Sequence, residues 1–216
     1  MQQLTRGILI AIEGIDGSGK STLARNLYTA FAAQTIDTIL TKEPGGSHLG
    51  KQLREILQKQ TTPLDPKAEY LLFAADRAQH FTEIIIPALH KGQLVISDRM
   101  GDSSIAYQGY GRGLDIAMIK TVNAWAMHGI KPDLIVYVVL DPAVAWQRIK
   151  ARNEALTTFE QESKAFIQRL ADGFETLFAN RNDVITLDGN DSPDLITQKA
   201  ITAIRAWIHS QQLIRQ

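Results

Sequence analysis

The chain of 216 residues contains no cysteine. This absence excludes disulfide bonds, thiolate metal sites and cysteine nucleophiles, and it is compatible with a reducing cytoplasm. Long apolar runs are also lacking, since no stretch approaches the ~18 residues that a membrane-spanning helix needs, and residues 1–7 are polar. Neither charge is in excess, because 23 Lys and Arg balance 23 Asp and Glu. We therefore expect a soluble cytoplasmic protein without a secretory signal, and net charge gives no reason to expect a nucleic-acid partner.

One glycine-rich stretch fits the phosphate-loop pattern G-x-x-x-x-G-K-[ST]. An apolar run over residues 8–12 precedes it and a helix-like segment over residues 23–31 follows it, which is the context that such a loop requires. Its glycines are not spaced as in the dinucleotide-binding motif G-x-G-x-x-G. The residues predicted to bind a nucleoside triphosphate are Gly14, Ile15, Asp16, Gly17, Ser18, Gly19, Lys20, Ser21 and Thr22.

The chemistry of this loop follows from its residue types. Backbone N–H groups and the N-terminus of the following helix favour a polyphosphate. Lys20 can reach the β- and γ-phosphates, and the Ser21 hydroxyl is placed to bind the accompanying Mg²⁺. The motif therefore predicts a triphosphate site with a divalent cation.

Apolar runs predict five strands of a parallel sheet, over residues 8–13, 38–41, 94–98, 134–140 and 184–187. Periodicity predicts helices over residues 21–34, 49–58, 66–89, 114–127, 142–152, 160–178 and 192–208. Residues 101–113 are small, polar and glycine-rich, so we expect a loop with a brief helical piece there. Strands alternating with helices indicate one domain over residues 1–216, an α/β three-layer fold of the P-loop NTPase type with helices on both faces of the sheet.

The third strand ends in Asp98-Arg99. In open α/β sheets, ligands bind at the carboxyl ends of the strands. Asp98 is a candidate for holding Mg²⁺ directly or through water, and the alternative is a salt bridge at the strand end. Arg99 can form a bidentate hydrogen-bonded contact with a phosphate. The next residue is not the Glu that polarises water in many ATPases, which favours transfer to a second phosphate.

Two further groups of residues are ambiguous by spacing alone. Arg148, Lys150 and Arg152 precede an aperiodic stretch, so this segment is either a lid that brings a cation to the phosphates or a solvated helix face. Phe73 and Arg77 share a helix face and could bind a planar base, although spacing favours a core Phe with a surface Arg. The five histidines show no metal-ligand spacing.

Several motifs occur together in a characteristic order. They are the phosphate loop with an acid two residues after its first glycine, Glu43-Pro44-Gly45-Gly46, Phe73 with Arg77, Asp98-Arg99, residues 103–109, Pro132-Asp133-Leu134 and Glu160-Gln161-Glu162-Ser163. Over nearly its whole length the chain resembles the bacterial type of the thymidylate kinase family. The resemblance implies transfer of the γ-phosphoryl group of ATP to dTMP, giving dTDP and ADP, with Mg²⁺ required and a homodimer as the assembly.

The resemblance also implies roles for individual residues of the acceptor site. By the family's pattern Asp16 receives the sugar 3′-hydroxyl, Phe73 stacks on thymine, and Arg77 bonds its O4 atom. Arg99 holds the acceptor phosphate, and Asp98 serves the metal and the acceptor region. The remaining residues that the resemblance assigns to substrate binding are Ser104 near N3 of the base, Tyr107 against C2′ and Gln108 from the same motif.

The chain departs from the family at the lid, which we expect over residues 148–160. Bacterial members usually have an Arg shortly before the Glu-Gln-Glu-Ser motif, but this chain has Thr157-Thr158-Phe159 there. Because Gly17 rather than an Arg occupies the phosphate loop, the catalytic cation must come from elsewhere. We predict that Arg152 or Arg148 supplies it. Lys42 and Met100 also depart from the usual Arg and the usual aromatic or His.

Three other functions are compatible with a phosphate loop. The first is a P-loop kinase of another small acceptor, and acceptor preference would separate it from a dTMP kinase. The second is a nucleotide-dependent switch or assembly ATPase, which would hydrolyse ATP slowly whether or not dTMP is present. The third is an inactive binding module in which the altered lid has abolished transfer.

Overall fold

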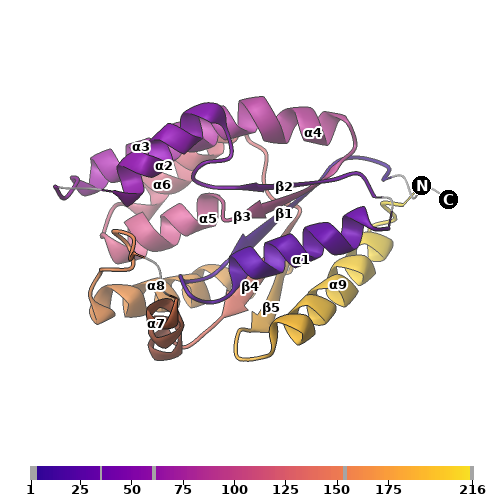
Figure 1. Cartoon of the computed structure of the whole chain (residues 1–216). Coiled ribbons are helices and arrows are strands. Elements are labelled where there is room, and N and C mark those ends of the chain that lie inside the picture. Colours follow the sequence, from indigo (N-terminus) through magenta and orange to yellow (C-terminus); the bar gives the residue numbers. More distant parts are fainter. Residues whose placement is uncertain (1–3, 35, 60–61, 153–154, 215–216) are drawn as a thin grey trace.

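The computed structural model describes residues 4–34, 36–59, 62–152 and 155–214. Within these ranges the chain forms one sheet of five parallel strands in the order β2-β3-β1-β4-β5 (Figure 1). The strands are β1 (Ile8–Glu13), β2 (Thr38–Lys42), β3 (Leu94–Asp98), β4 (Leu134–Val139) and β5 (Val184–Asp188). The predicted α/β fold with its parallel sheet is confirmed.

Helices connect these strands, most of them in the predicted sequence positions. They are α1 (Lys20–Ala32), α2 (His48–Gln58), α3 (Pro66–His80), the π-helical η1 (Phe81–Ile85), α4 (Ile86–His90), α5 (Gly101–Ser104), the π-helical η2 (Ile105–Gly111), α6 (Ile116–Ala126), α7 (Pro142–Ala151), α8 (Lys164–Phe178) and α9 (Pro193–Ser210). Among the described residues, none of these helices is long and apolar enough to cross a bilayer.

The sheet separates two apolar cores, and β1 at its centre contributes to both. Ile8, Ile10 and Ile12 pack under α1 and α9, whereas Leu9 and Ala11 face the core formed with η1, α4, η2 and α8. This alternation follows from the two-residue period of a strand. Helices α2, α3 and α6 pack together at the end of the molecule near β2 (Figure 1). Because all strands are parallel, their carboxyl ends open on one edge, where the loops meet.

The loop predicted over residues 101–113 is wrong, because α5 and η2 make most of this stretch helical and bury it. The glycines that suggested a loop serve close packing instead. A Cβ on Gly111 would lie 2.7 Å from a ring carbon of Phe166 in α8, and one on Gly109 would lie 3.0 Å from Ile116. Glycine therefore lets η2 approach its neighbours.

Two predicted helices differ in detail. The helix expected over residues 160–178 begins only at Lys164, because Ser163 is its N-cap and accepts a hydrogen bond from Phe166 N at 3.2 Å. The long helix expected over residues 66–89 is continuous but includes the π-helical turn η1 just before Pro87. Proline lacks an N–H and crowds the carbonyl four residues earlier, which a wider turn accommodates.

Candidate active site

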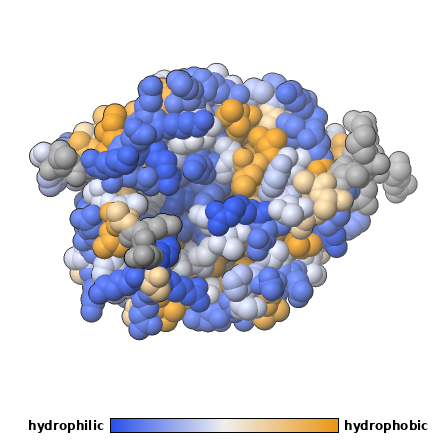
Figure 2. All heavy atoms as spheres, in the orientation of Figure 1, coloured by the Kyte–Doolittle hydropathy of each residue, from blue (hydrophilic) through white to orange (hydrophobic). Residues whose placement is uncertain are grey.

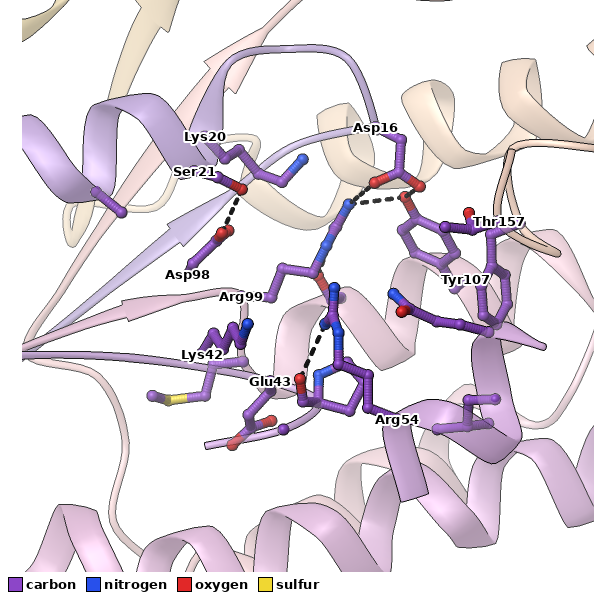
Figure 3. Close-up of a pocket in the computed structure, with 18 of the residues that line it drawn as sticks. Asp16, Lys20, Ser21, Lys42, Glu43, Arg54, Asp98, Arg99, Tyr107 and Thr157 are labelled. Atoms are coloured by element: carbon purple, nitrogen blue, oxygen red, sulfur yellow. Dashed lines mark hydrogen bonds and ion pairs between the residues drawn. The ribbon is translucent and has the colours of Figure 1, made fainter. Parts of the chain in front are cut away.

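A cavity of about 990 Å³ opens at the carboxyl ends of β1, β2 and β3. Its walls come from the loop before α1, the loop after β2, helix α3, the segment after β3 and the predicted lid. In Figure 3, Lys20, Ser21 and Asp98 lie on one side of the cavity, Tyr107 and Thr157 lie on the other, and Arg99 projects between them. The structure therefore brings together most of the residues that the sequence singled out.

The predicted phosphate loop joins β1 to α1. Gly14, Gly17 and Gly19 have φ angles of 145°, 81° and 98°, which favour glycine. Space is limiting as well, because a Cβ on Gly14 would lie 2.5 Å from the Val138 carbonyl oxygen. The loop can therefore curl tightly only with glycine at these positions.

Lys20 is buried at the start of α1, and its Nζ donates a hydrogen bond to the Ile15 carbonyl oxygen at 2.6 Å. Burial, helped by the neighbouring Arg99, lowers the pKa of Lys20 to about 8, although Asp16 and Asp98 oppose the shift. An anion in the loop would favour the charged form of this amine.

Ser21 and Asp98 meet although they are far apart in the sequence. Ser21 Oγ donates to Asp98 Oδ2 at 2.5 Å, and Asp98 Oδ1 is buried without a hydrogen-bond partner among the described residues. No cluster of three or more His, Cys, Asp or Glu side chains suited to a metal occurs in the described part of the chain. The pair nevertheless fits Mg²⁺, which takes one or two protein ligands and completes its shell with water and phosphate oxygens.

Arg99 is held in the cavity by four hydrogen bonds from its guanidinium. Its Nη1 donates to the Gly14 carbonyl oxygen at 3.0 Å and to Ser103 Oγ at 2.9 Å, and its Nη2 donates to Asp16 Oδ1 at 2.5 Å and to the Tyr107 hydroxyl at 3.0 Å. Burial alone would raise the pKa of Asp16, but Arg99 and Lys20 outweigh it and lower this pKa to about 2. Asp16 is therefore a carboxylate at neutral pH.

The far end of the cavity contains the residues predicted to bind a base. Arg77 is 1% exposed, so the surface Arg favoured by spacing is wrong. Its Nε donates to Glu43 Oε2 at 2.8 Å, its Nη1 to Asn123 Oδ1 at 2.7 Å, and its Nη2 to Ser104 Oγ at 3.0 Å. Arg77 Nη1 carries two N–H groups but has one hydrogen-bond acceptor among the described residues. Its second N–H therefore remains for a ligand.

Phe73 is half-buried and lines the cavity, with its ring centroid 5.8 Å from that of Phe159 in the predicted lid. Gln108 is buried beside it in the cavity wall, where its Nε2 donates to Glu69 Oε1 at 2.9 Å. Tyr107 packs edge-on against Phe159, which closes this end of the cavity.

The two predicted lid cations differ in their surroundings. Arg148 and Arg152 both line the cavity, whereas Lys150 is exposed, with its Nζ 5.0 Å from the Trp146 ring centroid. Arg152 forms an ion pair with Glu160, whose other carboxylate oxygen accepts from Thr157 N at 2.9 Å. Residues 153 and 154 of the predicted lid lie outside the described residues.

Three polar residues in or next to the site were given no role from the sequence. Arg54 of α2 lines the cavity and donates from Nη1 to the Pro44 carbonyl oxygen at 3.0 Å. Glu43 precedes Pro44 through a cis peptide bond and pairs with both Arg77 and His80 in the protein interior. Glu13 is completely buried at the end of β1. For Glu13 a signal was available, since a charged residue closed an otherwise apolar strand.

Comparison with known proteins identifies the family. Residues 12–200 match the family model described as Thymidylate kinase. The thymidylate kinase of Carboxydothermus hydrogenoformans is 45% identical over 191 residues, which cover 88% of this chain and 93% of the relative. That of Halothermothrix orenii is 44% identical over 205 residues, covering 94% and 99%.

Structural comparison agrees with the sequence comparison. The crystal structure of thymidylate kinase from Ehrlichia chaffeensis superimposes with a TM-score of 0.78 at 28% sequence identity, covering 92% of this chain and 99% of that one. Both comparisons span nearly the whole chain, including the cavity described above. The chain therefore belongs to the thymidylate kinase family.

Proposed function

We propose that this protein transfers the γ-phosphoryl group of ATP to dTMP and releases dTDP and ADP. The observation that carries the proposal is the position of Arg99, which faces the same cavity as the loop from Gly14 to Thr22. A donor phosphate in the loop and an acceptor phosphate at Arg99 would therefore lie side by side. Phosphoryl transfer depends mainly on such alignment and on cations around the transferred group.

The donor site is assigned to the loop and to Lys20. The loop's backbone and the start of α1 suit the triphosphate, and Lys20 supplies a positive charge on the β- and γ-phosphates. Ser21 and Asp98 are assigned to Mg²⁺, which would neutralise charge on the phosphate oxygens. The short contact between these two side chains and the unpartnered Asp98 oxygen support that assignment.

The acceptor site is assigned to Arg99 and the residues beyond it. Arg99 binds the acceptor phosphate by exchanging its contact with Asp16 for phosphate oxygens, and Asp16 is then available for the sugar 3′-hydroxyl. Phe73 stacks on thymine, and Arg77 donates its remaining N–H to O4. Ser104, Tyr107 and Gln108 complete the walls around the base and sugar. An acceptor phosphate is already ionised at neutral pH, so no catalytic base is required.

We assign the whole chain to one domain with a lid over residues 148–160. Arg148 and Arg152 are the candidates for the cation that stabilises charge during transfer, and both line the cavity. Thr158 Oγ1 donates to the Gln58 carbonyl oxygen of α2 at 3.1 Å, so this segment already reaches the opposite wall. A lid in this position would exclude water and limit hydrolysis of ATP.

A homodimer is proposed on the exposed apolar side chains of α3 and α6. Leu71 is 60% exposed, Met118 63% and Trp125 81%, on two helices that pack side by side. Figure 2 shows apolar side chains at the end of the molecule where α2, α3 and α6 lie. Large exposed apolar side chains on adjacent helices are typical of an interface. Sedimentation analysis should show a dimer that Trp125→Glu dissociates, whereas Leu195→Glu on α9 should leave it intact.

The cysteine-free chain suits a reducing compartment, and we propose the cytoplasm. The function is tested by measuring ADP formed from ATP and Mg²⁺ with dTMP, dUMP, dCMP, UMP or no acceptor. ADP should form mainly with dTMP. Equal ADP formation without an acceptor would indicate an ATPase, and preference for another monophosphate would indicate a different kinase.

A further inference from the structure

The backbone turns sharply at Arg99, immediately after β3. Arg99 has a φ angle of 72°, a left-handed conformation that is unfavourable for a residue with a side chain. Its own backbone is held on both sides, because its N–H donates to the Ile12 carbonyl oxygen at 2.9 Å and its carbonyl accepts from Ser97 Oγ at 2.7 Å. A strained conformation of this kind persists only where the surroundings fix it.

Glu13 fixes the next part of the turn. This side chain is completely buried at the end of β1, and its Oε1 accepts hydrogen bonds from the backbone N–H of Met100 at 2.8 Å and of Ser103 at 3.3 Å. A buried carboxylate is costly unless it is well satisfied by hydrogen bonds. Glu13 therefore binds the backbone that directly follows Arg99.

The second oxygen of Glu13 leads to the side chain of Arg99. Ser103 Oγ donates to Glu13 Oε2 at 2.5 Å and accepts from Arg99 Nη1 at 2.9 Å. Arg99 Nη1 gives its other N–H to the Gly14 carbonyl oxygen. Both N–H groups of Nη1 are thus used by protein groups that lie behind the guanidinium. The Nη2 N–H groups donate to Asp16 and Tyr107, so a phosphate reaches Nη2 by displacing Asp16, next to Nε, which is unpaired among the described residues.

We infer that Glu13 is a positioning residue which, through Ser103, aims the Nη2 and Nε edge of Arg99 at the acceptor phosphate. The inference rests on the proposed function of Arg99. Glu13 does not touch the substrate; it holds the backbone turn through Met100 and the guanidinium through Ser103. Fixing a cation before the phosphate arrives lowers the entropic cost of binding, so the effect should appear only with ligands that carry the phosphate.

The test compares binding of dTMP with binding of thymidine, which has the same base and sugar but no phosphate. At pH 8, Glu13→Gln keeps an oxygen for the backbone amides and removes the carboxylate that accepts from Ser103. Ser103→Ala removes the hydroxyl that connects Glu13 to Arg99. We expect each variant to bind dTMP about tenfold more weakly, in line with loss of one charge-assisted contact, and to bind thymidine within twofold of the unaltered protein. The double variant should bind dTMP little more weakly than either single variant, since both changes interrupt the same series of hydrogen bonds.

Asp133→Asn is the matched control. Asp133 Oδ2 accepts from Leu9 N at 2.8 Å, so it also anchors β1 through a carboxylate, but at the end of the strand away from the cavity. This variant should bind both ligands normally. If Glu13→Gln fails to fold, Ser103→Ala alone decides.

Arg99→Ala tests the phosphate-binding role of Arg99 separately from the positioning role of Glu13. If it abolishes the preference for dTMP over thymidine but Ser103→Ala and Glu13→Gln do not reduce it, the positioning role is overturned and the function of Arg99 stands. If Arg99→Ala leaves the preference intact, both are overturned. If all three variants reduce it, and Ser103→Ala has no further effect in the Arg99→Ala background, the inference is supported.

Discussion

Arg99 Nη2 lies 2.5 Å from Asp16 Oδ1, so the proposed phosphate-binding cation is paired with the carboxylate proposed to receive the sugar hydroxyl. Both groups are partly exposed to the cavity, with 15% and 28% of their side chains accessible. An acceptor phosphate must therefore compete with Asp16 for the guanidinium. The exchange would couple binding of the phosphate to release of Asp16 toward the sugar.

This coupling predicts opposite responses to two ligands in the Asp16→Asn variant. Binding of dTMP should weaken about five- to tenfold, because the carboxylate that accepts from the 3′-hydroxyl is lost. Binding of 2′,3′-dideoxythymidine monophosphate should be as tight as in the unaltered protein or tighter, because no hydroxyl contact is lost and Arg99 is less strongly paired. Calorimetry with both ligands measures this. Equal weakening of both would show that Asp16 acts only through the structure of the site.

Removal of the proposed metal ligands should change the response to Mg²⁺. In Asp98→Asn we expect half-saturation to require at least about tenfold more Mg²⁺ and kcat to fall about 100-fold, and in Ser21→Ala a smaller change of the same kind. Binding of dTMP without ATP should be retained. Asp188→Asn is the control, because Asp188 also ends a strand of the sheet, at its edge in β5. An unchanged Mg²⁺ response in Asp98→Asn would contradict the assignment.

The lid prediction concerns two arginines with one lysine between them. Arg148→Ala or Arg152→Ala should lower kcat by about 100-fold or more if that cation stabilises the transferred phosphoryl group, with little change in dTMP binding. Lys150→Ala should leave kcat unchanged, since Lys150 lies outside the cavity against Trp146. Steady-state kinetics of the three variants decide the matter. Normal kcat in both arginine variants would refute the proposal.

The buried carboxylate of Glu13 predicts a pH dependence of stability. Burial raises the pKa of Glu13 from 4.5 to about 7, and nearby Asp102 adds to the shift while Arg99 opposes it. The folded protein therefore holds an extra proton between these values, and this contribution to stability is lost as pH rises from about 4.5 to about 7. Relative to the unaltered protein, Glu13→Gln should gain up to about 3 kcal/mol in free energy of unfolding over this range. Chemical denaturation at pH 5 and pH 8 measures the gain, and a difference independent of pH would contradict it.

The parts of the molecule that were predictable are those encoded by neighbouring residues. Apolar runs predicted the five strands because strands buried on both faces need apolar side chains at nearly every position. The phosphate loop was recognisable because its glycines, Lys20 and Ser21 lie within nine residues. The sequence also placed Asp98 at the end of β3, facing that loop.

The parts that were missed depend on contacts between distant segments. Arg77 can be buried because Glu43, 34 residues away, supplies its counter-ion. Helical periodicity cannot predict that pairing. Residues 101–111 form helix, and their glycines fit closely against α8 and α6, whereas sequence rules take glycine as a sign of a loop. The connection from Glu13 to Arg99 spans more than 80 residues and passes through Ser103, so only the folded chain reveals it.

The most direct test of the proposed reaction follows the phosphoryl group itself. ATP labelled in the γ-phosphate is incubated with the protein, Mg²⁺ and dTMP, and the products are separated and counted. We expect the label in the β-phosphate of dTDP, in amounts equal to the ADP formed, with little inorganic phosphate if the proposed lid excludes water from the cavity. Label recovered as inorganic phosphate, at a rate independent of dTMP, would contradict the account.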